Sequence, residues 1–132
     1  MTALAYNPAG TQLATGTYSG GGLVVGGVLR LGAYGGSARL WDATSHRLLG
    51  APLDGHDFAG ENNGLAYTAD GRYLLVGHGG RGGGEIDFID ARTFEVADTL
   101  HADLPIGAIA VDPVAPMFVA TSRYRLFVWS IR

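Results

Sequence analysis

A similar stretch of 13 residues occurs three times along this chain, and this repetition constrains the fold more than any other feature. The copies are Leu4–Gly16, Leu65–Gly77 and Ile109–Thr121, which align without a gap at offsets of 61 and 44 residues. Each copy has a short apolar-alternating run, a turn and a second short apolar run. Repeats of about 40–50 residues built from short strands are typical of an array of sheet units rather than one closed core. The pattern therefore predicts a repeated β-architecture and a binding platform, but it does not identify the partner.

Each copy is followed by a third apolar run, and the first two copies are followed by a fourth. The third runs are Ala38–Asp42, Ile86–Asp90 and Leu126–Ser130, and the fourth runs are Arg47–Leu53 and Phe94–Leu100. Turn residues between β-rich runs at this spacing favour antiparallel meanders. Pro52 lacks an N–H donor, which suits an outer edge strand. A short helix over residues 92–100 is the alternative, but a strand fits the repeat better.

Short motifs at fixed places in these units resemble the WD-repeat β-propeller family. Trp41-Asp42 closes the third run of the first unit, Gly55-His56 follows its fourth run, and Ala69-Asp70-Gly71 lies between the first two runs of the second unit. The second unit, with Ile89–Val96, also resembles propellers of the YVTN type. The similarity extends over about residues 2–130. Both comparisons imply four-stranded blades arranged around an axis.

The resemblance implies an all-β partial propeller of about three antiparallel meander blades, the last of which lacks its outer strand. As a single partial propeller over residues 1–132, the chain divides into blade units at about 2–56, 63–101 and 107–131. Closed propellers have about four to eight blades. We therefore expect the chain to be the C-terminal part of a larger propeller, or to pair with other blades. Open blade faces and a free strand edge also favour self-association.

The family often has a buried hydrogen-bonded tetrad of His, Ser or Thr, Asp and Trp within a blade, and this sequence departs from it. Trp41 and Trp129 occupy the tryptophan position, but Ile89 replaces it in the middle unit. The aspartate position holds Gly35, Gly83 and Arg123. Apolar packing is therefore expected to stabilise these blades more than polar side-chain bonds do.

A glycine-rich insertion at residues 19–36 separates the second and third strands of the first unit. It makes this connection about 17 residues longer than the one in the third unit. Leu23–Val25 and Val28–Leu31 flank Gly26-Gly27, which predicts a hairpin because both turn positions favour positive φ. The hairpin either binds a partner or is a flexible extension without a specific role.

One glycine pattern, Gly77–Gly82, matches the G-x-G-x-x-G fingerprint of dinucleotide-binding proteins. That fingerprint needs a following helix whose N-terminus meets the pyrophosphate, whereas Glu85–Asp90 is typical of a strand. No cofactor is therefore expected. The net charge of −3 gives no electrostatic reason to expect nucleic acid or an anionic membrane as partner.

The residues that commonly carry catalysis or bind metals are scattered. The histidines are His46, His56, His78 and His101, and none has a close metal-ligand spacing with another. Asp54, Asp57 and Glu61 cluster in one loop, where solvated surface is a commoner role than acid–base chemistry. We expect no catalytic and no metal site. A chain with no cysteine, no signal peptide at its start and no apolar run of about 18 residues is predicted to be cytoplasmic.

In the geometry that the resemblance implies, loops after the second and fourth strands share one face of a propeller, here called the loop face. It would gather residues with aromatic, basic or acidic side chains: Tyr18, Arg30, Tyr34, His56, Asp57, Phe58, His78, Arg81, His101, Asp103, Arg123 and Tyr124. Tyrosine and arginine are favoured anchors in interfaces, although any one of them is about as often ordinary surface.

These observations predict a non-enzymatic protein–protein interaction scaffold that binds a protein or peptide partner through the loop face. Two alternatives stay open. One is a propeller enzyme or small-ligand binder whose site residues lie in other blades, and the other is a truncated fragment without independent function.

Overall fold

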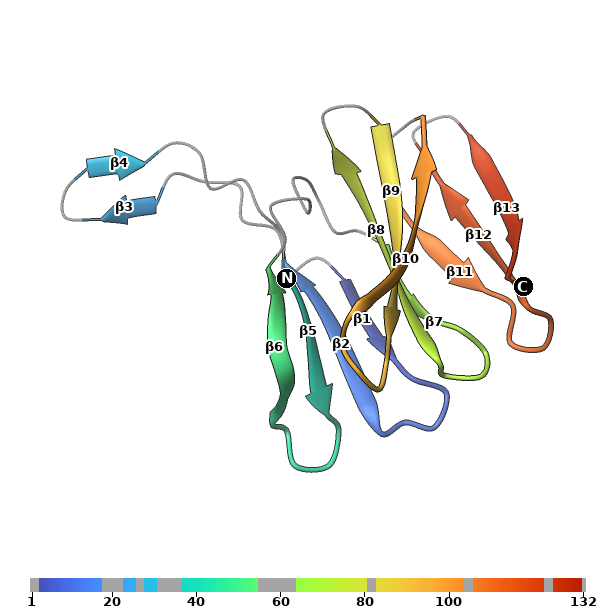
Figure 1. Cartoon of the computed structure of the whole chain (residues 1–132), viewed down its shortest axis with the longest axis horizontal. Helices are drawn as coiled ribbons and strands as arrows, with labels where there is room; N and C mark the ends of the chain where they lie inside the picture. Colours follow the sequence, from blue (N-terminus) through green and yellow to red (C-terminus); the bar gives the residue numbers. More distant parts are fainter. Residues whose placement is uncertain are drawn as a thin grey trace.

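Every regular element that the structure describes is a β-strand. The computed structural model describes residues 3–17, 23–25, 28–30, 37–54, 64–80, 83–103, 106–122 and 125–131. Within these ranges, the strands form three antiparallel sheets of three or four strands and one separate two-stranded sheet. Figure 1 shows the three larger sheets side by side. We call them blades 1, 2 and 3 in chain order.

Each blade is a meander in which strands neighbouring in sequence pair with one another, apart from the insertion in blade 1. Blade 1 contains β1 (Ala3–Tyr6), β2 (Gln12–Thr17), β5 (Ser37–Asp42) and β6 (Leu48–Asp54). Blade 2 contains β7 (Gly64–Tyr67), β8 (Tyr73–Gly80), β9 (Gly83–Asp90) and β10 (Val96–Ala102). Blade 3 contains β11 (Ile109–Val111), β12 (Met117–Thr121) and β13 (Leu126–Ser130). The predicted partial propeller with a three-stranded last blade is confirmed.

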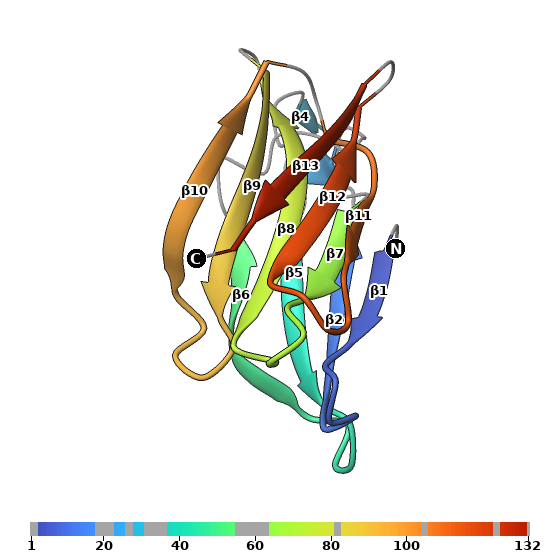
Figure 2. The ribbon, with the colours of Figure 1, turned by 90° about the vertical axis from the view of Figure 1, so that its right-hand side faces the viewer.

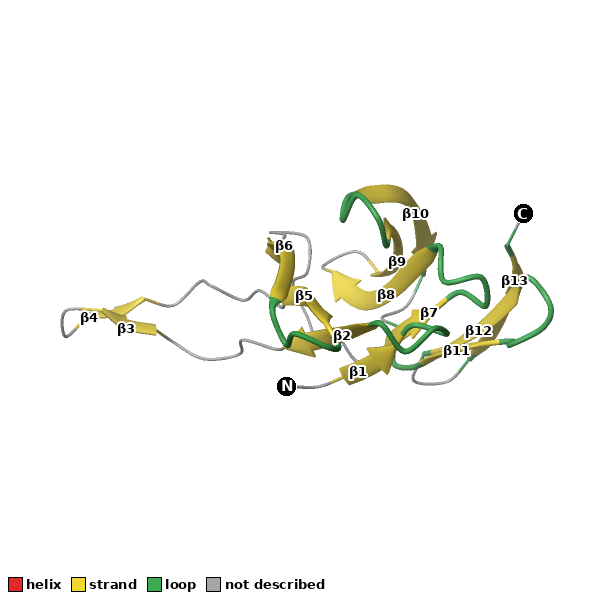
Figure 3. Ribbon diagram, turned by 90° about the horizontal axis from the view of Figure 1, so that it is seen from below, coloured by secondary structure: helices red, strands yellow, loops and turns green. Residues whose placement is uncertain are grey.

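Two details of the strand prediction are also confirmed. β10 covers most of the segment for which a short helix was the alternative, and Pro52 lies in β6, which pairs only with β5 at the outer edge of blade 1. The glycine-rich insertion contains β3 (Leu23–Val25) and β4 (Val28–Arg30), which pair antiparallel with Val25 opposite Val28. Figure 3 shows this small hairpin set apart from the three blades.

The first strand of each blade lies at the centre of the arrangement. β7 lies between β1 and β11, and the later strands of each blade fan outward, as Figures 2 and 3 show. Since strands alternate in direction, the connections β1–β2, β5–β6, β7–β8, β9–β10 and β11–β12 all emerge at one end, the lower end in Figure 1. We call it the turn end. The strand ends that lead into the predicted loop face lie at the opposite end.

The inner strands of blade 2, β7 to β9, are buried on both faces because their side chains alternate between the two neighbouring blades. Leu74, Val76 and Ile89 pack toward blade 1, against Ala14, Ala38 and Leu40. Leu75 and Ile86 pack toward blade 3, against Ile106, Phe118 and Ala120. All five of these blade 2 side chains are fully buried. A strand buried on both faces reads as a continuous apolar run, which is what residues 74–76 show.

Aromatic side chains continue the packing from blade 2 into blade 3. Phe88 meets Phe118 edge to face with ring centroids 5.9 Å apart, and Phe118 stacks on Trp129 at 5.1 Å. Trp129 also stacks on Phe127 at 5.3 Å. Edge-to-face and offset pairs at these distances stabilise a core beyond simple area burial. This contact network fixes blade 3 against blade 2.

The outward faces of blades 1 and 3 have no such cover among the described residues. On blade 3, Leu126 and Val128 are 64% and 56% exposed, whereas Phe118 on the inward face is 1% exposed. On blade 1, Leu4 and Tyr6 are 60% and 64% exposed. Blades 1 and 3, the outermost of the three, therefore each expose an apolar sheet face.

Candidate functional site

The turn end is built from short turns that share one hydrogen-bonding device. The carboxylate of Asp42 accepts the N–H groups of Thr44 and Ser45, and those of Asp90 and Asp112 accept two N–H groups each in the same way. Asp70 accepts the N–H of Arg72 and the hydroxyl of Thr68. Asx turns of this kind fix the local backbone. The turn end is therefore a set of pre-shaped connections.

These bonds also keep the four carboxylates ionised. In each case a hydrogen-bond donor is the main cause that holds the pKa of the aspartate below its usual range. The donor is the N–H of Ser45 for Asp42, the hydroxyl of Thr68 for Asp70, the N–H of Thr93 for Asp90 and the N–H of Ala115 for Asp112. Bonds donated to the charged form favour that form.

At the other end, only part of the predicted loop face belongs to the described structure. Tyr18, Tyr34, His56, Asp57, Phe58, Arg81, Arg123 and Tyr124 lie outside the described residues. Arg30 is the last residue of β4, and His78 lies in β8. His101 near the end of β10 and Asp103 just after it are both exposed. The acidic loop residues Asp57 and Glu61 also lie outside the described residues.

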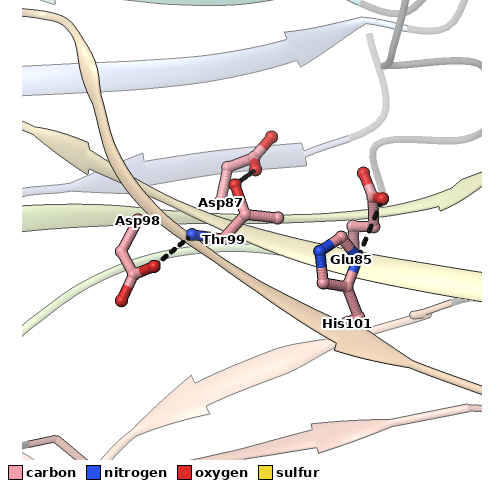
Figure 4. Close-up of polar contacts among 5 residues, drawn as sticks. All are labelled: Glu85, Asp87, Asp98, Thr99 and His101. Carbon is pink, nitrogen blue, oxygen red and sulfur yellow. Dashed lines mark hydrogen bonds and ion pairs between the residues drawn. The ribbon is translucent and has the colours of Figure 1, made fainter.

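The described part of the loop face has a polar cluster on β9 and β10, drawn in Figure 4. The Nδ1 atom of His101 lies 3.1 Å from the Oε1 atom of Glu85. Two residue pairs further from the loop face, the hydroxyl of Thr99 donates to the carboxylate of Asp87 at 2.6 Å. In backbone register, both His78 and His101 are opposite Glu85. The sheet thus places His78 and His101, which are 23 positions apart in sequence, on the two strands that flank Glu85. The sequence prediction did not include Glu85.

Glycine positions shape this end of blade 2. Gly83 has a φ of 146°, and a Cβ atom there would collide with the carbonyl oxygen of Ala102. This close approach lets β9 begin directly against the end of β10, next to His101 and Asp103. At Gly77, a Cβ atom would meet the side chains of Ile106 and Ile109. The glycines at 77 and 79–80 lie within β8, and β9 follows as a strand, so the pattern that resembles a dinucleotide fingerprint is part of a hairpin.

The chemistry that the described residues offer is polar recognition. His101 has a side chain that is 76% exposed, and its recorded partner is the carboxylate of Glu85. Within the described ranges, no group of three or more histidine, aspartate or glutamate side chains could hold a metal ion. None of the elements in those ranges is a helix that could cross a membrane.

A second feature, which the sequence prediction missed, lies at the turn end between blades 1 and 2. A cavity of about 400 Å³, here called the interblade cleft, is lined by Asn7, Gln12, Arg72, Asp90, Ala91 and Arg92. Both arginines follow an aspartate by two residues, as Asp70-Gly71-Arg72 and Asp90-Ala91-Arg92. This repeated spacing at two turns is the signal that could have identified them.

The partial tetrad in blade 1 also has structural consequences. The indole Nε1 of Trp41 donates to the hydroxyl of Thr15 at 3.0 Å, which joins β5 to β2. In blade 2 the corresponding Ile89 is fully buried in the core shared with blade 1. Blade 1 thus keeps one polar pair at this position, whereas blade 2 has apolar packing there.

No protein-family model and no curated protein sequence matches the chain. Solved structures do match in fold. A chain in the crystal structure of a mitotic checkpoint complex has a TM-score of 0.74 at 19% identity, over 99% of this chain and 36% of that chain. The WD40 repeats of RRP9 give 0.72 at 18% identity, over 98% of this chain and 35% of that chain.

An enzyme shares the fold as well. A chain of the hydrazine synthase of Kuenenia stuttgartiensis has a TM-score of 0.70 at 14% identity, over 96% of this chain and 31% of that chain. The chain thus spans about a third of the length of these structures. Taken with the three meander blades and the Trp41–Thr15 pair, these matches show that the chain has the fold of a partial WD-repeat β-propeller.

Proposed function

We propose that this chain is a protein-interaction scaffold that binds a protein or peptide partner through the loop face. The observation that carries the proposal is the position of His101 and Asp103, two exposed polar residues at the end of β10, on the blade whose inner strands pack against both neighbouring blades. Binding residues tend to lie on connections that a rigid scaffold positions. The likeness to a chain of the mitotic checkpoint complex supports a role in assembly with other proteins.

The exposed faces of blades 1 and 3 support a second part of the proposal. We propose that the chain works within a larger ring, in which further blades cover Leu4 and Tyr6 at one side and Leu126 and Val128 at the other. Blade 2 supports this view, because both of its faces are covered by neighbouring blades. Self-association through the same faces is the alternative. The cytoplasmic location stays a prediction.

The enzyme alternative has one observation in its favour, the shared fold of the hydrazine synthase chain. A fold alone does not carry chemistry, since propeller blades host many functions. The polar cluster of Glu85, Asp87, Thr99 and His101 contains the His101–Glu85 contact and the Thr99–Asp87 hydrogen bond, which do not form a nucleophile with a positioned base. We therefore favour the scaffold.

The experiment is a selection of peptides from a random displayed library against the full chain, followed by affinity measurement on variants. We expect the selected peptides to lose at least tenfold in affinity with His101→Ala/Asp103→Ala. The matched control is His46→Ala/Glu95→Ala, which removes one histidine and one carboxylate from exposed positions at the turn end. Equal affinities for the two double variants would show that the peptides bind elsewhere and would contradict the proposal.

A further inference from the structure

The interblade cleft at the turn end combines preformed walls with two arginines at its rim. Gln12 of blade 1 spans the gap, because its Nε2 donates to the carbonyl of Ala91 at 3.2 Å and its Oε1 accepts the hydroxyl of Tyr67 at 3.4 Å. Asn7 is held by the N–H groups of Thr11 and Gln12 on its Oδ1. These bonds place two primary amides at the wall in defined orientations.

The two arginines of the cleft make no ion pair with any other described residue. Arg72 and Arg92 are both exposed, and the guanidinium of Arg72 lies 5.3 Å from the ring centroid of Tyr73. Asp90 lines the same cleft, and Asp70 lies beside Arg72 in the neighbouring turn. Both carboxylates accept hydrogen bonds from their own turns, Asp90 from two N–H groups and Asp70 from one N–H and one hydroxyl. Each guanidinium therefore keeps its N–H donors available for an external acceptor.

The amides add further donors to the same space. A primary amide has two N–H hydrogens. Asn7 donates one to the hydroxyl of Thr11, and Gln12 donates one to the carbonyl of Ala91. A planar acceptor with two oxygens suits a guanidinium, which can bind it with two parallel hydrogen bonds. The volume of about 400 Å³ accommodates a side chain rather than only a small ion. With two cations and one carboxylate lining it, the cleft favours a single negative charge.

We propose that the interblade cleft binds a carboxylate side chain of an acidic peptide segment, held by Arg72 and Arg92. This site is independent of the loop face, because it lies at the opposite end of the blades. A ligand there contacts turns from two blades at once, so its binding also stabilises blade 1 against blade 2. The electrostatic share of the affinity weakens as salt is raised, because the site is open to solvent.

The test measures fluorescence anisotropy of a dye-labelled, end-blocked tetraglutamate peptide with the full chain. The variant Arg72→Gln/Arg92→Gln is compared with Arg47→Gln/Arg125→Gln, which removes the same charge from exposed arginines outside the cleft. We expect the first variant to bind at least tenfold more weakly than the unmodified chain and the second to bind as the unmodified chain does. Arg72→Lys/Arg92→Lys keeps the charge but not the planar donors, and we expect an intermediate loss.

Several outcomes overturn the proposal. They are an equal loss in both glutamine variants, equal binding of a tetraglutamine peptide, or no binding of tetraglutamate at millimolar protein. Competition distinguishes the source of the anion. Inorganic phosphate that displaces the peptide at lower concentration than acetate would assign the cleft to phosphate instead. Arg92→Gln alone keeps the Arg72–Tyr73 contact, so a several-fold loss in that single variant at an unchanged thermal midpoint assigns the loss to the missing guanidinium rather than to unfolding.

Discussion

Blades 2 and 3 have similar sequences and the same strand direction, yet they differ in burial. In β8 of blade 2, Leu74, Leu75 and Val76 are all fully buried, because consecutive residues face two different neighbours. In β13 of blade 3, exposed and half-buried residues alternate along the strand, because only one face has a neighbour. The comparison shows that a blade of this kind owes its buried core to the blades beside it, not to its own fold.

The largest expected effect uses the same substitution in both blades. Leu74→Ala removes a fully buried side chain and should lower the free energy of unfolding by about 3 kcal/mol. Leu126→Ala removes a side chain that is 64% exposed, and the loss should stay below about 0.5 kcal/mol. Urea denaturation followed by tryptophan fluorescence measures both. Similar losses would mean that something covers blade 3 in solution.

A glycine at the contact between the two blades gives the next largest effect. In Gly77→Ala, the new methyl group meets the side chains of Ile106 and Ile109, and overpacking of this kind costs about 1–3 kcal/mol. Gly107 is the matched position, since a Cβ atom there has only ordinary contacts with Thr121 at 3.5 Å and beyond. Gly107→Ala should be neutral or slightly stabilising in thermal unfolding. A stable Gly77→Ala variant would contradict the described packing of blade 3 on blade 2.

A variant of blade 1 tests whether the hydrogen bond between Trp41 and Thr15 stabilises a blade face that no neighbouring blade covers among the described residues. Thr15→Val keeps the shape of a buried side chain but removes the acceptor for the Trp41 indole, at a cost of about 1 kcal/mol. Thr99→Val in blade 2 removes the donor to Asp87 and serves as the comparison. Denaturant midpoints compare the two variants, and an unchanged midpoint for Thr15→Val would show that the indole bond contributes nothing.

The smallest expected effect concerns an aspartate that closes a turn at the turn end in both blade 2 and blade 3. It is Asp90 in blade 2 and Asp112 in blade 3. Because hydrogen bonds from Thr93 and Arg92 hold the pKa of Asp90 below its ordinary value of 3.8, its stabilising effect is complete above that value. This contribution is lost as the pH falls through the lowered pKa of the folded state. Asp112 in blade 3 has the same bonds and the same direction of shift.

Asp90→Asn and Asp112→Asn should therefore both flatten the fall in stability at acid pH, and to a similar extent, because each carboxylate accepts two N–H groups from its own turn. Asp103→Asn is the control, since its exposed side chain does not close one of these turns. Thermal midpoints measured between pH 2 and pH 6 check this prediction. A different pH dependence of the thermal midpoint in the two variants would show that packing of a blade against its neighbours also affects the stability of its turns.

Much of this fold could be predicted from the sequence, because each blade is a local meander whose pairing follows from adjacent strands. The three aligned copies located β1, β2, β7, β8, β11 and β12, and Pro52 placed β6 at an edge. Burial could not be predicted in the same way. Leu74 and Leu126 both lie in apolar runs, and only the arrangement of the blades decides that one is inside and the other exposed.

The candidate sites were harder to predict for a related reason. Glu85 becomes notable only because the backbone register places it opposite both His78 and His101. Arg72 and Arg92 belong to different turns of blade 2, which the N–H of Ala91 joins by donating to the carbonyl of Arg72, and Gln12 of blade 1 closes the other side of the cleft. Sequence spacing identifies Arg72 and Arg92 as turn residues, whereas only strand register and the packing of the blades bring them to one site.

The bridge made by Gln12 has a mechanical consequence. Its one side chain is tied at both ends of the amide to blade 2, so a hinge rotation between the first two blades would stretch a bond whichever way it turned. Burial raises the pKa of the Tyr67 phenol that forms one of these ties, so the hydroxyl keeps its proton at any physiological pH. The bridge therefore resists rotation of the first two blades against each other near their turns.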